Sequence, residues 1–174
     1  MSSYMQYFFD HSGQVLPVVA VAILWVGFAA LGGAVSGKGR MRTLDPLIGW
    51  AWVGFMFTAA GVFLDVPFTN LAVATAVIAA GAGVWVWRRD GGVIPSVFLR
   101  MLVLAIPLFL LVSAMRASQW DEFTDWLIIP RYMLETDSFP SKENPYPNAV
   151  FTGYPYSWHF VTYLASRIAG SLLE

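Results

Sequence analysis

The sequence predicts an all-α integral membrane protein with about four transmembrane helices. Three observations favour this class: long apolar segments, too little charge for a water-facing surface, and basic residues gathered between alternate segments. Of the 174 residues, 57% are hydrophobic and 12% are charged, whereas an ordinary soluble domain has about 25% charged residues. The net charge is −1 and there is no cysteine. The chain therefore lacks the basic field typical of nucleic-acid binding and has no thiols for disulfides or metal ligands.

Four apolar segments are close to the length that crosses a membrane, which is about 20 residues. They are residues 15–35, 46–64, 67–87 and 97–114. The first of them could be mistaken for a signal peptide, but Asp10 precedes it and no Lys or Arg comes before residue 38, whereas signal peptides begin with a basic region. We therefore predict a retained helix there, and a four-helix transmembrane region over residues 1–115.

Small residues recur at a spacing of four within these segments. The pairs are Ala29 and Gly33, Ala76 and Ala80, and Ala79 and Gly83. Small residues at this spacing let two membrane helices approach closely. The alternative is that Ala and Gly are simply frequent in this chain.

Basic residues predict the orientation, because Lys and Arg gather on the cytoplasmic side of a membrane. They lie between the first two segments and between the last two: Lys38, Arg40, Arg42, Arg88 and Arg89. Loops 36–45 and 88–95 should then be cytoplasmic, and the N-terminus and residues 116–156 extracytoplasmic. The predicted location is the inner (plasma) membrane, with several passes through the lipid bilayer.

Residues 116–156 should form an extracytoplasmic loop with short helices, rich in acids and aromatics. Residues 120–126 read WDEFTDW, so a helix would bring Asp121 and Asp125 onto one face, at a cost of about 0.2–0.5 kcal/mol. A cation, Arg116 or Arg131, or a raised pKa on one carboxylate would relieve this repulsion. A carboxylate held among aromatics at a bilayer surface suits a general base. The alternative is that the segment only lies among the lipid headgroups.

Other polar residues of the loop are open to two interpretations. Arg131 and Glu135 can form a surface pair at i,i+4, but an arginine fork also matches phosphate oxygens. His159 stands near the start of a further apolar stretch, where a packed histidine is more common than a ligand. The sequence contains two distant histidines and therefore no histidine-based metal signature, and it contains no phosphate-binding glycine loop or serine nucleophile elbow.

Residues 157–174 are predicted to begin a further apolar helix, the start of a fifth span. A charged residue such as Arg167 is unfavourable inside such a span, and the stretch is too short for a full crossing. One interpretation is that the chain is the front part of a longer protein.

The acidic motif and the Tyr154-Pro155-Tyr156 turn resemble the GT-C superfamily of multispanning membrane glycosyltransferases, which use polyprenyl-phosphate sugars. The likeness is to the N-terminal part of a bacterial group of uncharacterised members, whose loop has Trp-Asp-Glu-Phe, then a polar residue, His and Trp, and later Tyr-Pro-Pro. Asp125 stands where that group tends to have His, and Tyr156 where it has a second Pro. Family members are much longer, which implies that this chain alone would be inactive.

The resemblance implies an inverting transfer of a sugar from the lipid-linked donor to an extracytoplasmic acceptor. It makes Asp121 the general base, while Glu122 would orient the acceptor or, with Asp121, hold a divalent cation if one is used. The substrate-binding residues it suggests are Asp125, Arg131, Tyr154 and His159, with Arg131 on the leaving phosphate.

Two other functions compete with this one. A non-catalytic small multispanning subunit or scaffold would use the outer loop as a docking surface, since aromatic residues and Arg are enriched at interfaces. A transporter is a weaker alternative, because no predicted span has an acidic residue in its interior and such residues usually mark ion pathways.

Overall fold

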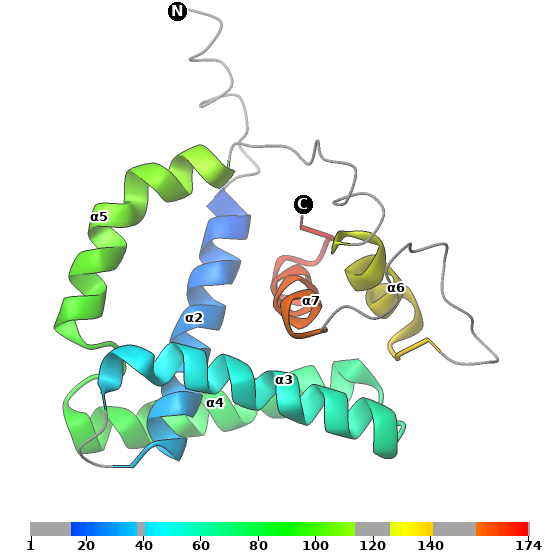
Figure 1. Ribbon diagram of the computed structural model, residues 1–174, viewed down its shortest axis with the longest axis horizontal. Coiled ribbons are helices and arrows are strands. Elements are labelled where there is room, and N and C mark those ends of the chain that lie inside the picture. Colours follow the sequence, from blue (N-terminus) through cyan, green and yellow to red (C-terminus); the bar gives the residue numbers. More distant parts are fainter. Residues whose placement is uncertain (1–14, 38–40, 114–125, 141–155, 174) are drawn as a thin grey trace, which may run out of the picture.

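The computed structural model describes residues 15–37, 41–113, 126–140 and 156–173, and this part of the chain is helical without a strand (Figure 1). The all-α prediction is therefore confirmed. The elements are α2 (Val15–Val35), η2 (Arg42–Leu44), α3 (Asp45–Phe63), α4 (Phe68–Asp90), α5 (Ser96–Ser113), α6 (Ile128–Thr136) and α7 (Ser157–Ala169). Three of them are long and apolar enough to cross a membrane: α2, α3 together with η2, and α4. The fourth predicted span, α5, is apolar but shorter.

Local sequence explains where the helices begin and end. Asp45 stands in the first turn of α3 and Pro46 follows it, as suits a helix N-terminus. Helix α4 starts directly after Pro67, has basic residues in its last turn, and ends where Gly91 adopts a left-handed conformation with φ of 75°. Basic residues favour the negative end of the helix dipole, and glycine accepts positive φ without strain.

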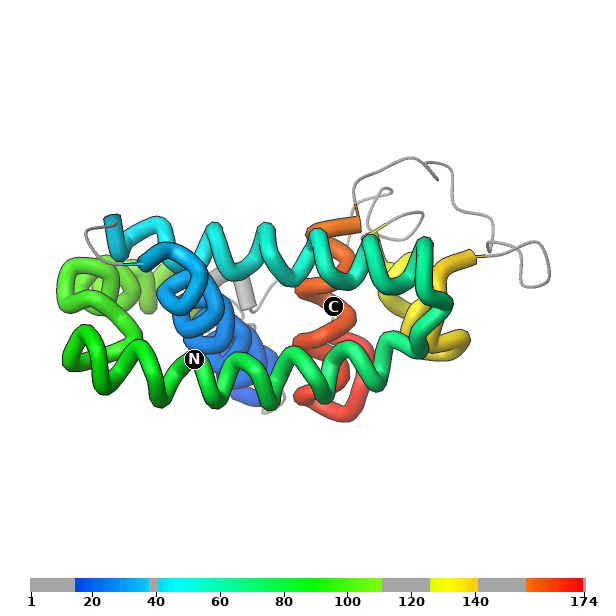
Figure 2. The backbone as a smooth tube through the Cα atoms, turned by 90° about the horizontal axis from the view of Figure 1, so that it is seen from below, coloured from blue at the N-terminus to red at the C-terminus, as the bar shows by residue number. Residues whose placement is uncertain are grey.

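Helices α3 and α4 run antiparallel, with α2 and α7 lying between them (Figure 2). In Figure 1, α2 crosses the α3–α4 pair steeply. The arrangement therefore differs from a bundle of near-parallel helices. The core lies where α2, α3, α4 and α7 meet, and it includes Phe28, Val53, Phe57, Phe68 and Phe160.

The α2–α3 crossing depends on two glycines. A Cβ atom on Gly32 would overlap the backbone carbonyl of Asp45, and one on Gly49 would overlap the carbonyl of Phe28. Neither glycine belongs to a small-residue pair predicted from the sequence. On the other side of α2, a Cβ on Gly83 would be in ordinary contact with Ala30, 3.7 Å away, so this member of a predicted pair does face α2.

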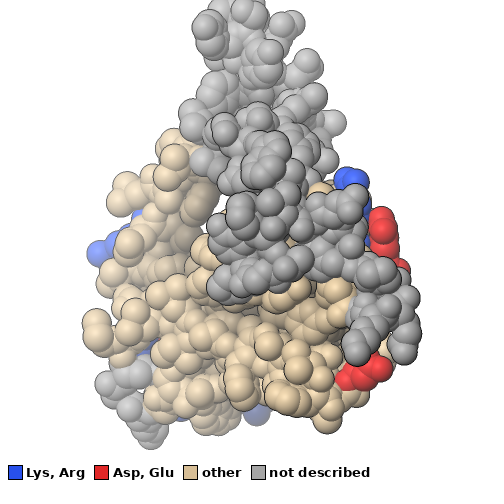
Figure 3. Space-filling view, turned by 45° about the vertical axis from the view of Figure 1, so that its right-hand side comes forward, with Lys and Arg blue, Asp and Glu red and all other residues tan. Residues whose placement is uncertain are grey.

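The apolar surface of the described residues is extensive. Most side chains of α5 are exposed, Leu104 by 81%, and few charged atoms interrupt the tan surface in Figure 3. Soluble monomers rarely expose contiguous apolar patches larger than a few hundred Å². Together with three candidate spans, this surface supports a protein that resides in a membrane.

Helix α7 lies within residues 157–174, where the sequence predicts the start of a further apolar helix. It has 13 residues, about 20 Å at 1.5 Å per residue, whereas the hydrocarbon core is about 30 Å thick. It ends at Gly170, which has a φ of 77°. One face, including Phe160, Tyr163 and Leu164, is buried, so α7 is an amphipathic helix packed on the core. Its buried apolar residues belong to the core cluster, and a fifth span at this place stays a prediction.

Candidate functional site

The structure describes two of the six predicted site residues. Asp121, Glu122, Asp125 and Tyr154 lie outside the described residues, so their predicted roles are untested. The other two occupy neighbouring helices, Arg131 on α6 and His159 on α7.

His159 is packed in an aromatic stack. Its side chain is 1% exposed, and its ring stacks on Trp126 with a centroid distance of 5.5 Å and an interplanar angle of 20°. The Tyr156 ring lies 5.7 Å away in a tilted orientation. Trp126 is the last residue of the acidic motif, so the stack joins the end of this motif to α7.

Arg131 lies on the opposite face of α6 from the core. Its neighbours Ile129, Pro130, Tyr132 and Met133 are buried, whereas Arg131 is exposed. No ion pair joins it to Glu135 within the described part of the chain, although the spacing permits one. Arg131 is therefore exposed, and among the described residues no hydrogen bond or ion pair joins its side chain to the His159 stack.

A cluster of aromatic rings from four segments adjoins the stack through Tyr156. Phe57 of α3 lies 5.1 Å from Phe160 of α7, centroid to centroid. Phe68 of α4 lies 4.8 Å from Phe139, edge to face, and 5.9 Å from Tyr163. Edge-to-face pairs add about 0.5–1.5 kcal/mol beyond their area of burial. This cluster fixes α7, and with it His159, against the α3–α4 pair.

Asp137 is the centre of a polar network that joins α4, α6 and α7. Its Oδ1 accepts hydrogen bonds from the Thr69 backbone N–H (2.8 Å), the Thr69 hydroxyl (2.7 Å), the Tyr163 hydroxyl (3.1 Å) and Arg167 (2.9 Å). Its backbone carbonyl accepts from the Phe68 N–H at 2.9 Å. Asp137 therefore satisfies two of the first N–H groups of α4, which no residue within α4 can satisfy.

This network also changes the titration of Tyr163. Burial raises the pKa of its hydroxyl and outweighs the hydrogen bonds from Arg167 and Thr69, which lower it. Arg167 donates from Nε to the Tyr163 oxygen at 3.2 Å, so it links the tyrosine to the Asp137 carboxylate.

Sequence reasoning did not identify the Asp137 network. Its members lie far apart in the chain: Thr69 and Asp137 are separated by 68 in sequence. One local signal was present: Tyr163 and Arg167 stand at i,i+4, the spacing at which side chains meet on a helix. Nothing in the sequence indicated that Asp137 would meet them.

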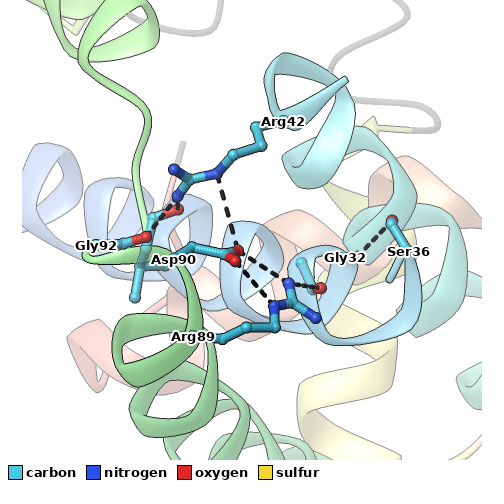
Figure 4. A network of polar contacts seen from close by, with 8 residues as sticks. Gly32, Ser36, Arg42, Arg89, Asp90 and Gly92 are labelled. Atoms are coloured by element: carbon cyan, nitrogen blue, oxygen red, sulfur yellow. Dashed lines mark hydrogen bonds and ion pairs between the residues drawn. The ribbon is translucent and has the colours of Figure 1, made fainter. Parts of the chain in front are cut away.

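A second polar network lies at the other end of α4 (Figure 4). Arg89 forms a two-fold pair with Asp90, each contact 2.9 Å, and donates to the carbonyl of Gly33 in the last turn of α2 at 2.8 Å. Arg42 donates to the Gly92 carbonyl and lies 3.9 Å from Asp90. The network ties together the connections between α2 and α3 and between α4 and α5.

The two networks are separated by the length of α4. This helix has 23 residues, which corresponds to about 35 Å. The hydrocarbon core of a bilayer is about 30 Å thick. Polar contacts thus concentrate at the two ends of a helix that is long enough to cross a membrane.

The described residues contain no group of three or more metal-ligating side chains. Asp121 and Glu122, the candidates for holding a divalent cation, are outside this part of the chain. A cation at that pair stays a prediction.

Comparison with known proteins adds no relative. No family model, no curated protein and no solved structure matches the chain.

Proposed function

We propose that the chain is a glycosyltransferase-like membrane protein that transfers a sugar from a polyprenyl-phosphate donor to an extracytoplasmic acceptor. The observation that carries the proposal is the Asp121-Glu122 pair in an aromatic segment whose last residue, Trp126, stacks on the buried His159. In this proposal the protein lies in the inner membrane and has four spans. The N-terminus and residues 116–156 are extracytoplasmic.

The proposed reaction is a displacement at the anomeric carbon of the donor. The acceptor hydroxyl oxygen attacks this carbon and inverts its configuration, while the bond from carbon to phosphate oxygen breaks. The bonding pair leaves with polyprenyl phosphate, and Asp121 takes the proton of the attacking hydroxyl. Glu122 orients the acceptor, and an arginine compensates the charge of the leaving phosphate.

Two features of the described structure support this proposal. Arg131 is exposed on the helix that follows the acidic motif, and its fork can pair with phosphate oxygens. The aromatic cluster packs α7 against α3 and α4, so the His159 stack adjoins two candidate spans. A lipid-linked donor would approach the protein from the bilayer around those spans.

The decisive variant is Asp121→Asn in the full-length protein. Membranes from expressing cells would be supplied with radiolabelled polyprenyl-phosphate mannose or glucose, and label incorporated into acceptor would be measured. We expect loss of about 100-fold or more, as is typical when a general base is removed. Asp65→Asn is the matched control, since Asp65 is an exposed aspartate in the α3–α4 turn with a φ of 50°, and asparagine tolerates that conformation.

Transfer that survives Asp121→Asn, or a wild-type protein that transfers neither sugar, would refute the proposal. The non-catalytic alternative would then account better for the outer loop.

A further inference from the structure

The two ends of α4 carry different net charge. At the end where α4 stops, the described residues include four arginines, Arg42, Arg88, Arg89 and Arg100, against two acids, Asp45 and Asp90. At the other end they include Asp65, Glu135 and Asp137 against Arg131 and Arg167. The net charge of these described residues, arginines minus acids, is therefore +2 at the first end (4 − 2) and −1 at the second (2 − 3). In Figure 3 the visible acidic atoms all lie on one side of the molecule.

The four arginines of the basic end fall into two kinds. Arg42 and Arg89 are held by Asp90 and by backbone carbonyls. Arg88 and Arg100 are exposed and form no hydrogen bond or ion pair within the part of the chain that the structure describes. The charge that the network does not neutralise is therefore on two accessible guanidinium groups.

These two arginines are surrounded by apolar surface. Trp85 and Trp87 of α4 are exposed beside Arg88, and Val97, Leu99 and Met101 of α5 are exposed around Arg100. Tryptophan is enriched at the boundary between lipid tails and water, where Arg reaches toward the headgroups. An exposed arginine can contact the headgroup of a phospholipid, and an exposed tryptophan can lie at the boundary between headgroup and acyl chains. The exposed aliphatic side chains can contact the acyl chains themselves.

We propose that Arg88 and Arg100, on either side of the α4–α5 connection, bind the phosphate groups of anionic phospholipids. The acyl chains of these lipids lie along α4 and α5. A guanidinium offers parallel N–H donors to two phosphate oxygens, and a negatively charged headgroup compensates the excess positive charge. The inference does not depend on a glycosyltransferase activity.

The test is native mass spectrometry of the purified protein in non-ionic detergent, incubated with phosphatidylglycerol or with phosphatidylcholine of the same acyl chains. Wild-type protein should retain phosphatidylglycerol in preference to phosphatidylcholine. A basic residue near an anionic lipid surface contributes about five-fold in affinity, so Arg88→Gln with Arg100→Gln should weaken phosphatidylglycerol binding about twenty-five-fold if the two add.

Two controls separate this site from general attraction and from misfolding. Arg167→Gln removes an exposed arginine at the other end of the molecule, which is already paired with Asp137, and should leave binding unchanged. Arg88→Lys with Arg100→Lys keeps both charges and should retain most of the preference for phosphatidylglycerol.

Three results would overturn the proposal: equal retention of both lipids by wild-type protein, full binding by the double glutamine variant, or an equal loss in Arg167→Gln.

Discussion

At the scale of single residues, Asp137 connects more of the molecule than any predicted site residue that the structure describes. It has a φ of 57°, and its carboxylate is 30% exposed. Aspartate tolerates this left-handed conformation better than most residues. The conformation ends α6 and directs the carboxylate toward the first turn of α4 and toward Arg167 on α7.

Asp137→Ala should therefore destabilise the protein by about 2 kcal/mol, because it removes a helix cap and charge-assisted hydrogen bonds that are partly screened by solvent. The measurement is the free energy of unfolding in detergent. Asp65→Ala is the matched control, since it also replaces an aspartate at positive φ, in an exposed turn. An equal loss in both variants would mean that the Asp137 contacts add nothing beyond backbone conformation.

Tyr163 predicts a dependence of stability on alkaline pH. Its pKa in the folded protein is raised above the ordinary value of 10.0. Below that value the hydroxyl is neutral in both states and its contribution is fully present. As pH rises above 10.0, the unfolded state loses the proton first, so stability falls until the folded pKa is passed.

Tyr163→Phe removes this titration. The difference in unfolding free energy between wild type and variant should be constant from neutral pH to about 10, and should shrink above it. A difference that stays constant at higher pH would contradict the raised pKa.

At the scale of elements, the crossing of α2 and α3 requires backbones that touch. A side chain at Gly49 would meet the Phe28 carbonyl, which belongs to a rigid helix and cannot rotate away. Membrane helices commonly associate through such small-residue contacts, because lipid tails give no hydrophobic drive for them to associate.

Gly49→Ala should thus cost about 1–3 kcal/mol through overpacking, although alanine favours helix by about 1 kcal/mol relative to glycine. Gly81→Ala on α4 is the control, because a Cβ atom there meets nothing within 4 Å, and it should be neutral or stabilising. Thermal unfolding of both variants in detergent gives the comparison. If Gly49→Ala were as stable as Gly81→Ala, the close crossing would not exist in the folded protein.

At the scale of the whole molecule, sequence patterns located the long helices well. The first predicted segment, residues 15–35, coincides with α2 (Val15–Val35), and the other three differ from α3, α4 and α5 by at most three residues at either end. Apolar length and terminal residues are local properties, so a single sequence contains them. The further apolar helix predicted for residues 157–174 contains α7 (Ser157–Ala169), and the fifth span stays a prediction.

The candidate site could be predicted only in part from the sequence. The sequence singled out His159 and favoured a packed role for it, and the structure buries it in an aromatic stack. The stacked residues Trp126 and His159 are 33 positions apart. No pattern in either segment predicts that their side chains would be in contact. The roles of Asp121 and Glu122 stay predictions.

By itself, the sequence determined the helical class, the apolar surface and the extents of the long helices, because hydrophobicity and end residues act over short stretches of chain. Only the tertiary structure decided that α2 passes between α3 and α4, that α7 stops at Gly170, and that Asp137 joins three helices. Those features depend on the shapes and polar groups of segments distant in the chain. Whether such segments pack together depends on contacts that form only in the folded protein.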